Sequence, residues 1–143
     1  MSHKGRLKKV GKSSKKMYGP SKLLVCGYPE SEQQVLLSLL EENGLRVFPV
    51  IFATNDDMQR TLKEILESDD RYGQGEGSDM KRAIIMSGFT QKKLHTLMAA
   101  HRSSELPTQL WAALTPLSET WSVADLLDEL AAEAEAIKKQ TKK

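Results

Sequence analysis

The residues best suited to act as a nucleophile or general base are Cys26, Ser87, His95 and His101. A serine with a histidine partner would support acyl transfer, but Ser87 lacks the Gly-x-Ser-x-Gly context that exposes a nucleophilic serine. The two histidines are six residues apart and so face different sides of a helix, unlike the i, i+4 pair of a metal-binding helix. We therefore expect both histidines to be structural or solvent-facing.

Cys26 lies inside an apolar run, where burial raises the pKa of a thiol and leaves it an inert small hydrophobe. The adjacent acids Asp56-Asp57 and Asp69-Asp70 have diverging side chains, which makes them poor cation ligands. The sequence therefore predicts no catalytic residue, no metal site and no cofactor, and it favours a protein that is not an enzyme. An enzyme with residues carried on loops is an alternative.

The elements that must position any site begin with two apolar runs, residues 22–26 and 82–87. Each is followed by glycine and then an aromatic residue, as Gly27-Tyr28 and Gly88-Phe89. A short apolar run without polar alternation is typical of a strand buried on both faces. Glycine after the strand allows a turn that a Cβ would obstruct.

This unit is part of a longer internal repeat with a constant spacing of 61 residues. The matched pairs are Gly27 and Gly88, Tyr28 and Phe89, Leu36 and Leu97, Leu45 and Leu106, Thr54 and Thr115, and Leu66 and Leu127. A gap-free match over about 45 residues indicates a βαβα unit that occurs twice in one closed domain.

Strands are predicted at residues 22–26, 47–53, 82–87 and 109–114. Helices are predicted after each strand: one capped by Ser31, one capped by Thr54, and two over residues 91–103 and 123–139. Pro49 cannot donate a hydrogen bond to a neighbouring strand, so it places the second strand at a sheet edge.

Right-handed crossovers then predict a four-stranded, parallel α/β sheet of order 2-1-3-4 with helices on both faces. The alternative is a ferredoxin-like α/β sandwich. In a parallel sheet of this order, ligands bind outside the strand C-termini where the order reverses. The candidate residues of this crevice are Gly27, Tyr28, Thr54, Asn55, Gly88, Phe89, Thr115 and Pro116.

The charge is unevenly distributed along the 143 residues, although the net charge is only +2. Residues 23–137 hold nine basic side chains against all 19 acids, a net charge of −10, whereas residues 1–22 hold eight basic side chains and no acid. We expect a basic flexible tail at 1–21 and one domain at 22–139, made of repeat 22–67, linker 68–80 and repeat 81–139. The tail residues that could contact a polyanion are Lys8, Lys9, Lys12, Lys15 and Lys16.

The second half resembles a known family on several short motifs. These are Ser87-Gly88-Phe89-Thr90-Gln91-Lys92-Lys93-Leu94, then Leu106-Pro107, Leu114-Thr115-Pro116 and Trp121 before an acidic, leucine-rich helix. Over residues 82–135 they resemble the bacterial domain of unknown function family 3783 (DUF3783). The resemblance implies an uncharacterised cytoplasmic bacterial protein and assigns no catalytic residue.

These observations favour a non-catalytic binding or regulatory module that holds a protein or small-molecule partner in the crevice. The alternative is a binder of RNA or another anionic partner through the basic tail. A single cysteine fits a reducing, cytoplasmic compartment, and no apolar run approaches the ~20 residues that span a bilayer, so we expect no membrane partner. The oligomeric state is not predicted by the sequence.

Overall fold

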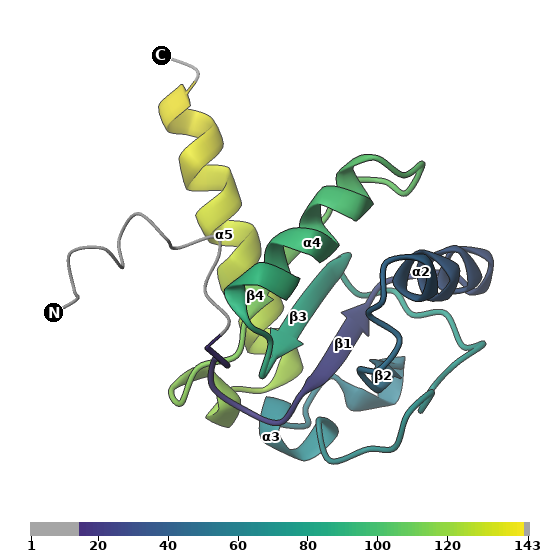
Figure 1. Cartoon of the computed structure of the whole chain (residues 1–143). Coiled ribbons are helices and arrows are strands. Elements are labelled where there is room, and N and C mark those ends of the chain that lie inside the picture. The colour runs from purple at the N-terminus through teal and green to yellow at the C-terminus, as the bar shows by residue number, and fades with distance from the viewer. Residues whose placement is uncertain (1–14, 142–143) are drawn as a thin grey trace, which may run out of the picture.

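The computed structural model describes residues 15–141 and contains a four-stranded sheet in the predicted order, β2-β1-β3-β4 (Figure 1). The strands are β1 (Lys22–Cys26), β2 (Val50–Phe52), β3 (Ala83–Ser87) and β4 (Leu110–Ala113). The helices are α2 (Glu30–Glu42), α3 (Leu62–Ile65), α4 (Gln91–Arg102) and α5 (Val123–Thr141), with short 3₁₀ turns η2 (Asn55–Asp57) and η3 (Ser118–Thr120).

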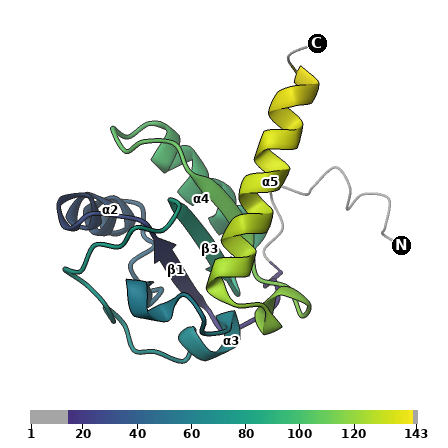
Figure 2. The same cartoon turned by 180° about the vertical axis from the view of Figure 1, so that it is seen from behind.

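Helices cover both faces of the sheet, as predicted, and the α/β fold is thereby confirmed. Side chains of β1 alternate between the faces: Leu23 and Val25 pack with the leucines of α2 and α4, whereas Leu24 and Cys26 pack with α3 and α5. Figures 1 and 2 show this three-layer arrangement, with α5 extending well beyond the sheet. A third layer distinguishes the fold from a ferredoxin-like sandwich.

The strand directions correct the prediction of a parallel sheet. Strand β1 is parallel to β2 and β3 is parallel to β4, but the two central strands β1 and β3 run antiparallel. Two like halves that meet through the same edge become antiparallel when a twofold axis stands perpendicular to the sheet. That axis keeps α2 and α4 on one face, where they pack into one apolar cluster. An axis along the strands would have separated them.

The register shows the internal repeat directly. Leu24 of β1 pairs with Ile85 of β3, which is its own counterpart 61 residues later, so the pseudo-twofold axis passes through this pair. The spacing between partners is 27 residues in both parallel pairs, as in Leu24 with Ile51 and Ile85 with Ala112.

A second contact on the same axis joins the repeats away from the central strands. Thr61 and Ser122, again 61 apart, form an isolated antiparallel bridge. Its two hydrogen bonds are symmetric: Leu62 N donates to Trp121 O at 3.0 Å, and Val123 N donates to Arg60 O at 2.9 Å. The βαβα unit therefore occurs twice in one domain.

Two helix starts differ from the prediction. Helix α2 begins at Glu30 after Pro29, with no side-chain cap, so Ser31 is not its cap. Thr54 does not begin a long helix, because its reciprocal hydrogen bonds with Asp57 close only the short turn η2. A second capping box, Thr61 with Glu64, then starts the four-residue helix α3.

The predicted linker and the end of the predicted tail both lie against the domain. Arg71 N donates to Val50 O, and Phe52 N donates to Tyr72 O, so the linker pairs with the outer edge of β2. Met17 N donates to Phe89 O at 2.8 Å, and Met17 packs on the core. The packed chain therefore begins before the predicted boundary at residue 22. Within residues 15–141, no helix has the length and apolar character needed to cross a membrane.

Candidate functional site

The predicted crevice between the two glycine turns does not form. Because β1 and β3 are antiparallel, Gly27 and Gly88 lie at opposite ends of the sheet. Each turn instead contacts the chain that leads into the other central strand: Gly27 faces Met80, and Gly88 faces Gly19. The structure therefore separates the eight crevice candidates into two groups of four.

The crevice candidates at the ends of the outer strands have local structural contacts. Thr54 bonds to Asp57, and the equivalent Thr115 bonds in the same way to Ser118. Asn55 Oδ1 accepts a hydrogen bond from Asp79 N at 2.9 Å. These contacts fix turns, and Pro116 beside them is exposed.

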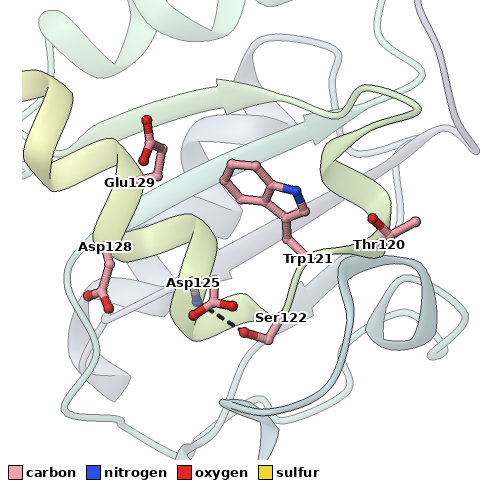
Figure 3. A pocket seen from close by; sticks show the side chains of 6 residues that line it. All are labelled: Thr120, Trp121, Ser122, Asp125, Asp128 and Glu129. Atoms are coloured by element: carbon pink, nitrogen blue, oxygen red, sulfur yellow. Dashed lines mark hydrogen bonds between the residues drawn. The ribbon is translucent and has the colours of Figure 1, made fainter.

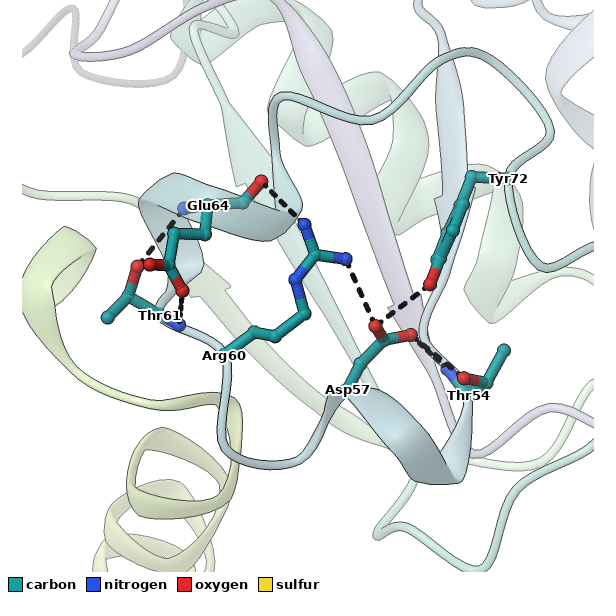
Figure 4. A network of polar contacts seen from close by, with 6 residues as sticks. All are labelled: Thr54, Asp57, Arg60, Thr61, Glu64 and Tyr72. Atoms are coloured by element: carbon teal, nitrogen blue, oxygen red, sulfur yellow. Dashed lines mark hydrogen bonds and ion pairs between the residues drawn. The ribbon is translucent and has the colours of Figure 1, made fainter.

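The most buried carboxylate of the described chain belongs to a structural network (Figure 4). Asp57 is 1% exposed and accepts hydrogen bonds from Thr54 N, Thr54 Oγ1, Tyr72 Oη and Arg60 Nη1 at 2.8–3.1 Å. Burial by itself raises the pKa of Asp57, but the donors from Thr54, Tyr72 and Arg60 together outweigh it and hold the pKa below its usual value. With both oxygens satisfied, Asp57 ties η2 to the linker and is not poised for catalysis.

The candidate nucleophiles are not assembled with a base. Ser87 is fully buried at the opposite end of β3 from His101, and its hydroxyl has no hydrogen-bond partner among the described residues. Burial, followed by the nearby charge of Asp57, raises the pKa of Cys26 to about 12. His95 is exposed. Between residues 15 and 141, no three side chains of His, Cys, Asp or Glu gather where they could hold a metal ion.

A cavity of about 480 Å³ lies beside the start of α5 (Figure 3). It is lined by Thr120, Trp121, Ser122, Asp125, Asp128 and Glu129. The three carboxylates are exposed, and Asp128 already makes a 3.5 Å ion pair with Lys81. None of the six lining side chains has a buried polar atom without a partner in the described chain. This cavity therefore lacks fixed groups that would orient a ligand.

The two ends of the sheet differ in a way that the pseudo-twofold axis makes visible. At one end, Phe48 and Phe89 stack with ring centroids 4.1 Å apart; at the other, their counterparts Gln109 and Tyr28 form a 2.7 Å hydrogen bond. The matched positions, apolar end first, are Phe48 and Gln109, Phe89 and Tyr28, Leu40 and His101, and Ser21 and Arg82. We call the second location the polar end.

Arg82 is the centre of the polar end and is only 17% exposed. Its guanidinium carbon lies 4.0 Å from the centroid of the Tyr28 ring, and Nη1 is in close ionic contact with Glu32 Oε1, without the alignment of a hydrogen bond. Arg82 Nε, Arg82 Nη2 and Gln109 Nε2 are buried and find no hydrogen-bond partner among residues 15–141. We call these three atoms the open donors.

Two cavities adjoin the open donors. One, of about 240 Å³, is lined by Met98, His101, Arg102, Leu106, Thr108, Gln109 and Trp111. The other, of about 400 Å³, is lined by Lys81, Arg82, Thr108, Gln109 and Leu110. Because Thr108 and Gln109 line both, these two residues form the wall between the cavities.

Titratable groups of the polar end are held in their neutral forms. Burial raises the pKa of Tyr28 to about 12, although Arg82 and Gln109 act in the opposite direction. His101 is 6% exposed, and burial together with the Arg82 charge lowers its pKa, although a hydrogen bond to the Pro107 carbonyl opposes this. Its Nε2 has no partner in the described part of the chain. The polar end thus combines one buried cation with neutral hydrogen-bonding groups.

The sequence reasoning identified Tyr28 as a candidate but missed Arg82, His101 and Gln109 as its companions. The signal was present in the repeat, as mismatches instead of matches. A buried leucine or phenylalanine in the first half faces a histidine or glutamine in the second. A pair of that kind marks a position where packing alone does not explain the residue.

The basic residues predicted to contact polyanions are only partly visible. Lys8, Lys9 and Lys12 lie outside the described residues. Lys16 forms an antiparallel bridge with Thr90, directly before α4. It is therefore near the first turn of α4, which carries Lys92 and Lys93.

Comparison with known proteins finds one family. No curated protein and no solved structure matches the chain. Residues 82–137 match the model of a family described as "Domain of unknown function (DUF3783)". The matched segment runs from Arg82, just before β3, into α5, which is one of the two repeats. The second repeat therefore resembles DUF3783, as its motifs predict.

Proposed function

We propose that this chain is a non-catalytic binding module that holds a small molecule at the polar end of its sheet. The observation that carries the proposal is the set of open donors on Arg82 and Gln109. A buried donor without an acceptor destabilises a fold by about 1–3 kcal/mol. The apolar end supports the proposal, because equivalent positions there are filled by Phe48 and Ser21 without such donors in the described chain. A ligand that supplies acceptors removes this unfavourable term.

Tryptophan fluorescence tests this proposal. Trp111 lines the 240 Å³ cavity, whereas Trp121 lies at the other cavity, so the variant Trp121→Phe leaves Trp111 as the reporter. We expect compounds from a panel of amino acids, carboxylic acids, sugars and nucleotides to change the Trp111 emission and raise the melting temperature. A Trp111 signal that no compound in the panel changes would contradict the proposal.

A variant guided by the repeat serves as the control. Gln109→Phe places at the polar end the residue that packs at the equivalent apolar position, Phe48. We expect this variant to fold with equal or greater stability and to lose the fluorescence response. A response that survives both Gln109→Phe and Arg82→Met would place binding elsewhere on the protein.

We propose polyanion binding through the basic N-terminal segment as a second candidate. It is supported by the position of Lys16 beside Thr90, which brings the end of this segment to the first turn of α4 with Lys92 and Lys93. Deletion of residues 1–14 should weaken RNA binding and reduce its dependence on salt, because each phosphate contact contributes about 0.7 to the slope on single strands. Binding that is indifferent to salt would refute this candidate.

A further inference from the structure

We infer that the ligand of the polar end is a monocarboxylic acid with an apolar body, and that Arg82 binds its carboxylate. This inference rests on the proposed function and adds the chemical class of the ligand. It is carried by the part of the Arg82 guanidinium that is left without acceptors in the described chain.

The open edge of Arg82 has the geometry of a carboxylate clamp. Nε and Nη2 form one side of the planar guanidinium, and their two N–H bonds are parallel, which matches the two oxygens of a carboxylate. Glu32 contacts the remaining nitrogen, Nη1, and so leaves this side unused. The ring of Tyr28, 4.0 Å from the guanidinium carbon, covers one face of the group and holds its plane.

The charges around the site favour one negative charge over two. Arg82 already faces the carboxylate of Glu32, and Lys81 at the second cavity is paired with Asp128. His101 is held neutral, as described above, and Arg102 at the rim is exposed, where solvent and salt screen its charge. A dianionic phosphate would meet the negative charge of Glu32 with less compensation than a carboxylate would.

The first cavity sets the chemistry of the rest of the ligand. Met98, Leu106 and Trp111 provide apolar and aromatic walls in about 240 Å³, which suits a small ring or a short branched chain. Gln109 separates this cavity from Arg82, with Oε1 held by Tyr28 Oη. When the Gln109 side chain turns, the cavities join, the carboxylate reaches Arg82, and Gln109 Nε2 becomes available as a third donor.

Titration of the full chain with matched probes tests the inference by ¹H–¹⁵N spectroscopy. Benzoate carries the carboxylate, benzamide is its neutral isostere, and phenyl phosphate is the dianion. We expect benzoate to shift the Arg82 Nε–H and the Gln109 side-chain amide signals, and to bind at least about tenfold more tightly than either other probe.

Two arginine variants separate charge from geometry. Arg82→Lys keeps the charge but lacks the parallel pair of donors, so we expect benzoate affinity to fall by about tenfold or more. Arg46→Lys, at the 3.0 Å ion pair with Asp70 on the β2 side, is the matched control and should leave the affinity unchanged. A retained amide spectrum in each variant checks that it is folded.

The outcomes distinguish this inference from the proposed function. If benzamide binds as tightly as benzoate and changes Trp111 fluorescence, the binding module stands and the carboxylate inference is wrong. Tighter binding of phenyl phosphate than of benzoate also overturns the monoanion. Benzoate affinity that survives Arg82→Lys refutes the role of Arg82, and no response at Trp111 to any compound refutes both proposals.

Discussion

Alanine at Gly27 or Gly88 should destabilise the protein strongly, through two separate effects. Both glycines have left-handed backbone, with φ of +76° and +66°, where a Cβ is strained by about 1–2 kcal/mol. A Cβ at Gly27 would also lie 2.6 Å from Met80 O, and one at Gly88 would lie 2.5 Å from Gly19 O. Those contacts are with backbone, which moves at a further penalty of about 1–3 kcal/mol.

The expected loss is therefore about 2–5 kcal/mol in the free energy of unfolding. At about 4 °C per kcal/mol for a chain of this size, the melting temperature should fall by roughly 8–20 °C. The two variants should behave alike, because the pseudo-twofold axis places both glycines in the same turn against the same kind of neighbour. Thermal and urea unfolding, followed by circular dichroism, measure both quantities.

Two other glycines separate the effects. Gly44 has φ of +72°, but a Cβ at this position would have no described atom within 4 Å, so Gly44→Ala should show only the backbone strain of about 1–2 kcal/mol. Gly77 is not left-handed and its nearest contact is Pro29 Cα at 3.9 Å, so Gly77→Ala should change stability by less than about 0.5 kcal/mol. If Gly44→Ala melts with Gly88→Ala, or Gly27→Ala with Gly77→Ala, the reasoning about these turns is wrong.

Three further predictions concern buried groups. Asp57→Asn should lower stability at neutral pH by about 3 kcal/mol; in the wild type this contribution is complete above the unfolded-state pKa near 3.9 and is lost as the pH falls through the depressed folded-state pKa, so the variant should show a weaker acid loss in urea titrations. His101→Leu introduces the residue of the equivalent position 40 and should not destabilise the protein. Because the folded-state pKa of His101 is lowered, wild-type stability should fall as the pH drops below about 6.5, and this variant should reduce that slope. Cys26 should resist a thiol reagent at pH 8 in the native state and react fully in guanidinium, since its pKa is about 12; native-state labelling would refute its burial.

The sequence allowed the repeat, the strand order and the covered faces to be predicted, because these depend on residue type and spacing. The direction of β3 relative to β1 could not be predicted in the same way. Apolar runs such as 22–26 and 82–87 pair equally well in either direction, and the choice depends on whether α2 and α4 share a face. The short helix α3 was misread because Thr54 and Thr61 are both good caps, and only the contacts of Asp57 show which one starts a helix.

The candidate site was less accessible to sequence reasoning. Its location at the strand C-termini was inferred from a parallel sheet, and the antiparallel centre of the sheet removed that crevice. The importance of Arg82 depends on which of its nitrogens lack acceptors, which is a property of packing and not of spacing. Tyr28 was a candidate for its place after a glycine, but its contacts with Arg82 and Gln109 come from residues more than 50 positions away.

The pseudo-twofold axis also has a consequence for how the chain folds at high concentration. Each half presents nearly the same edge, β1 in one and β3 in the other, and native pairing joins these edges within one molecule. The same edges on two molecules can pair in the same antiparallel manner, so native docking competes with an exchanged dimer. The intervening chain gives native docking an effective concentration in the millimolar range, which protects folding in dilute solution. Refolding at comparable protein concentrations should shift this competition toward exchange, with the central strand pair as the place where it occurs.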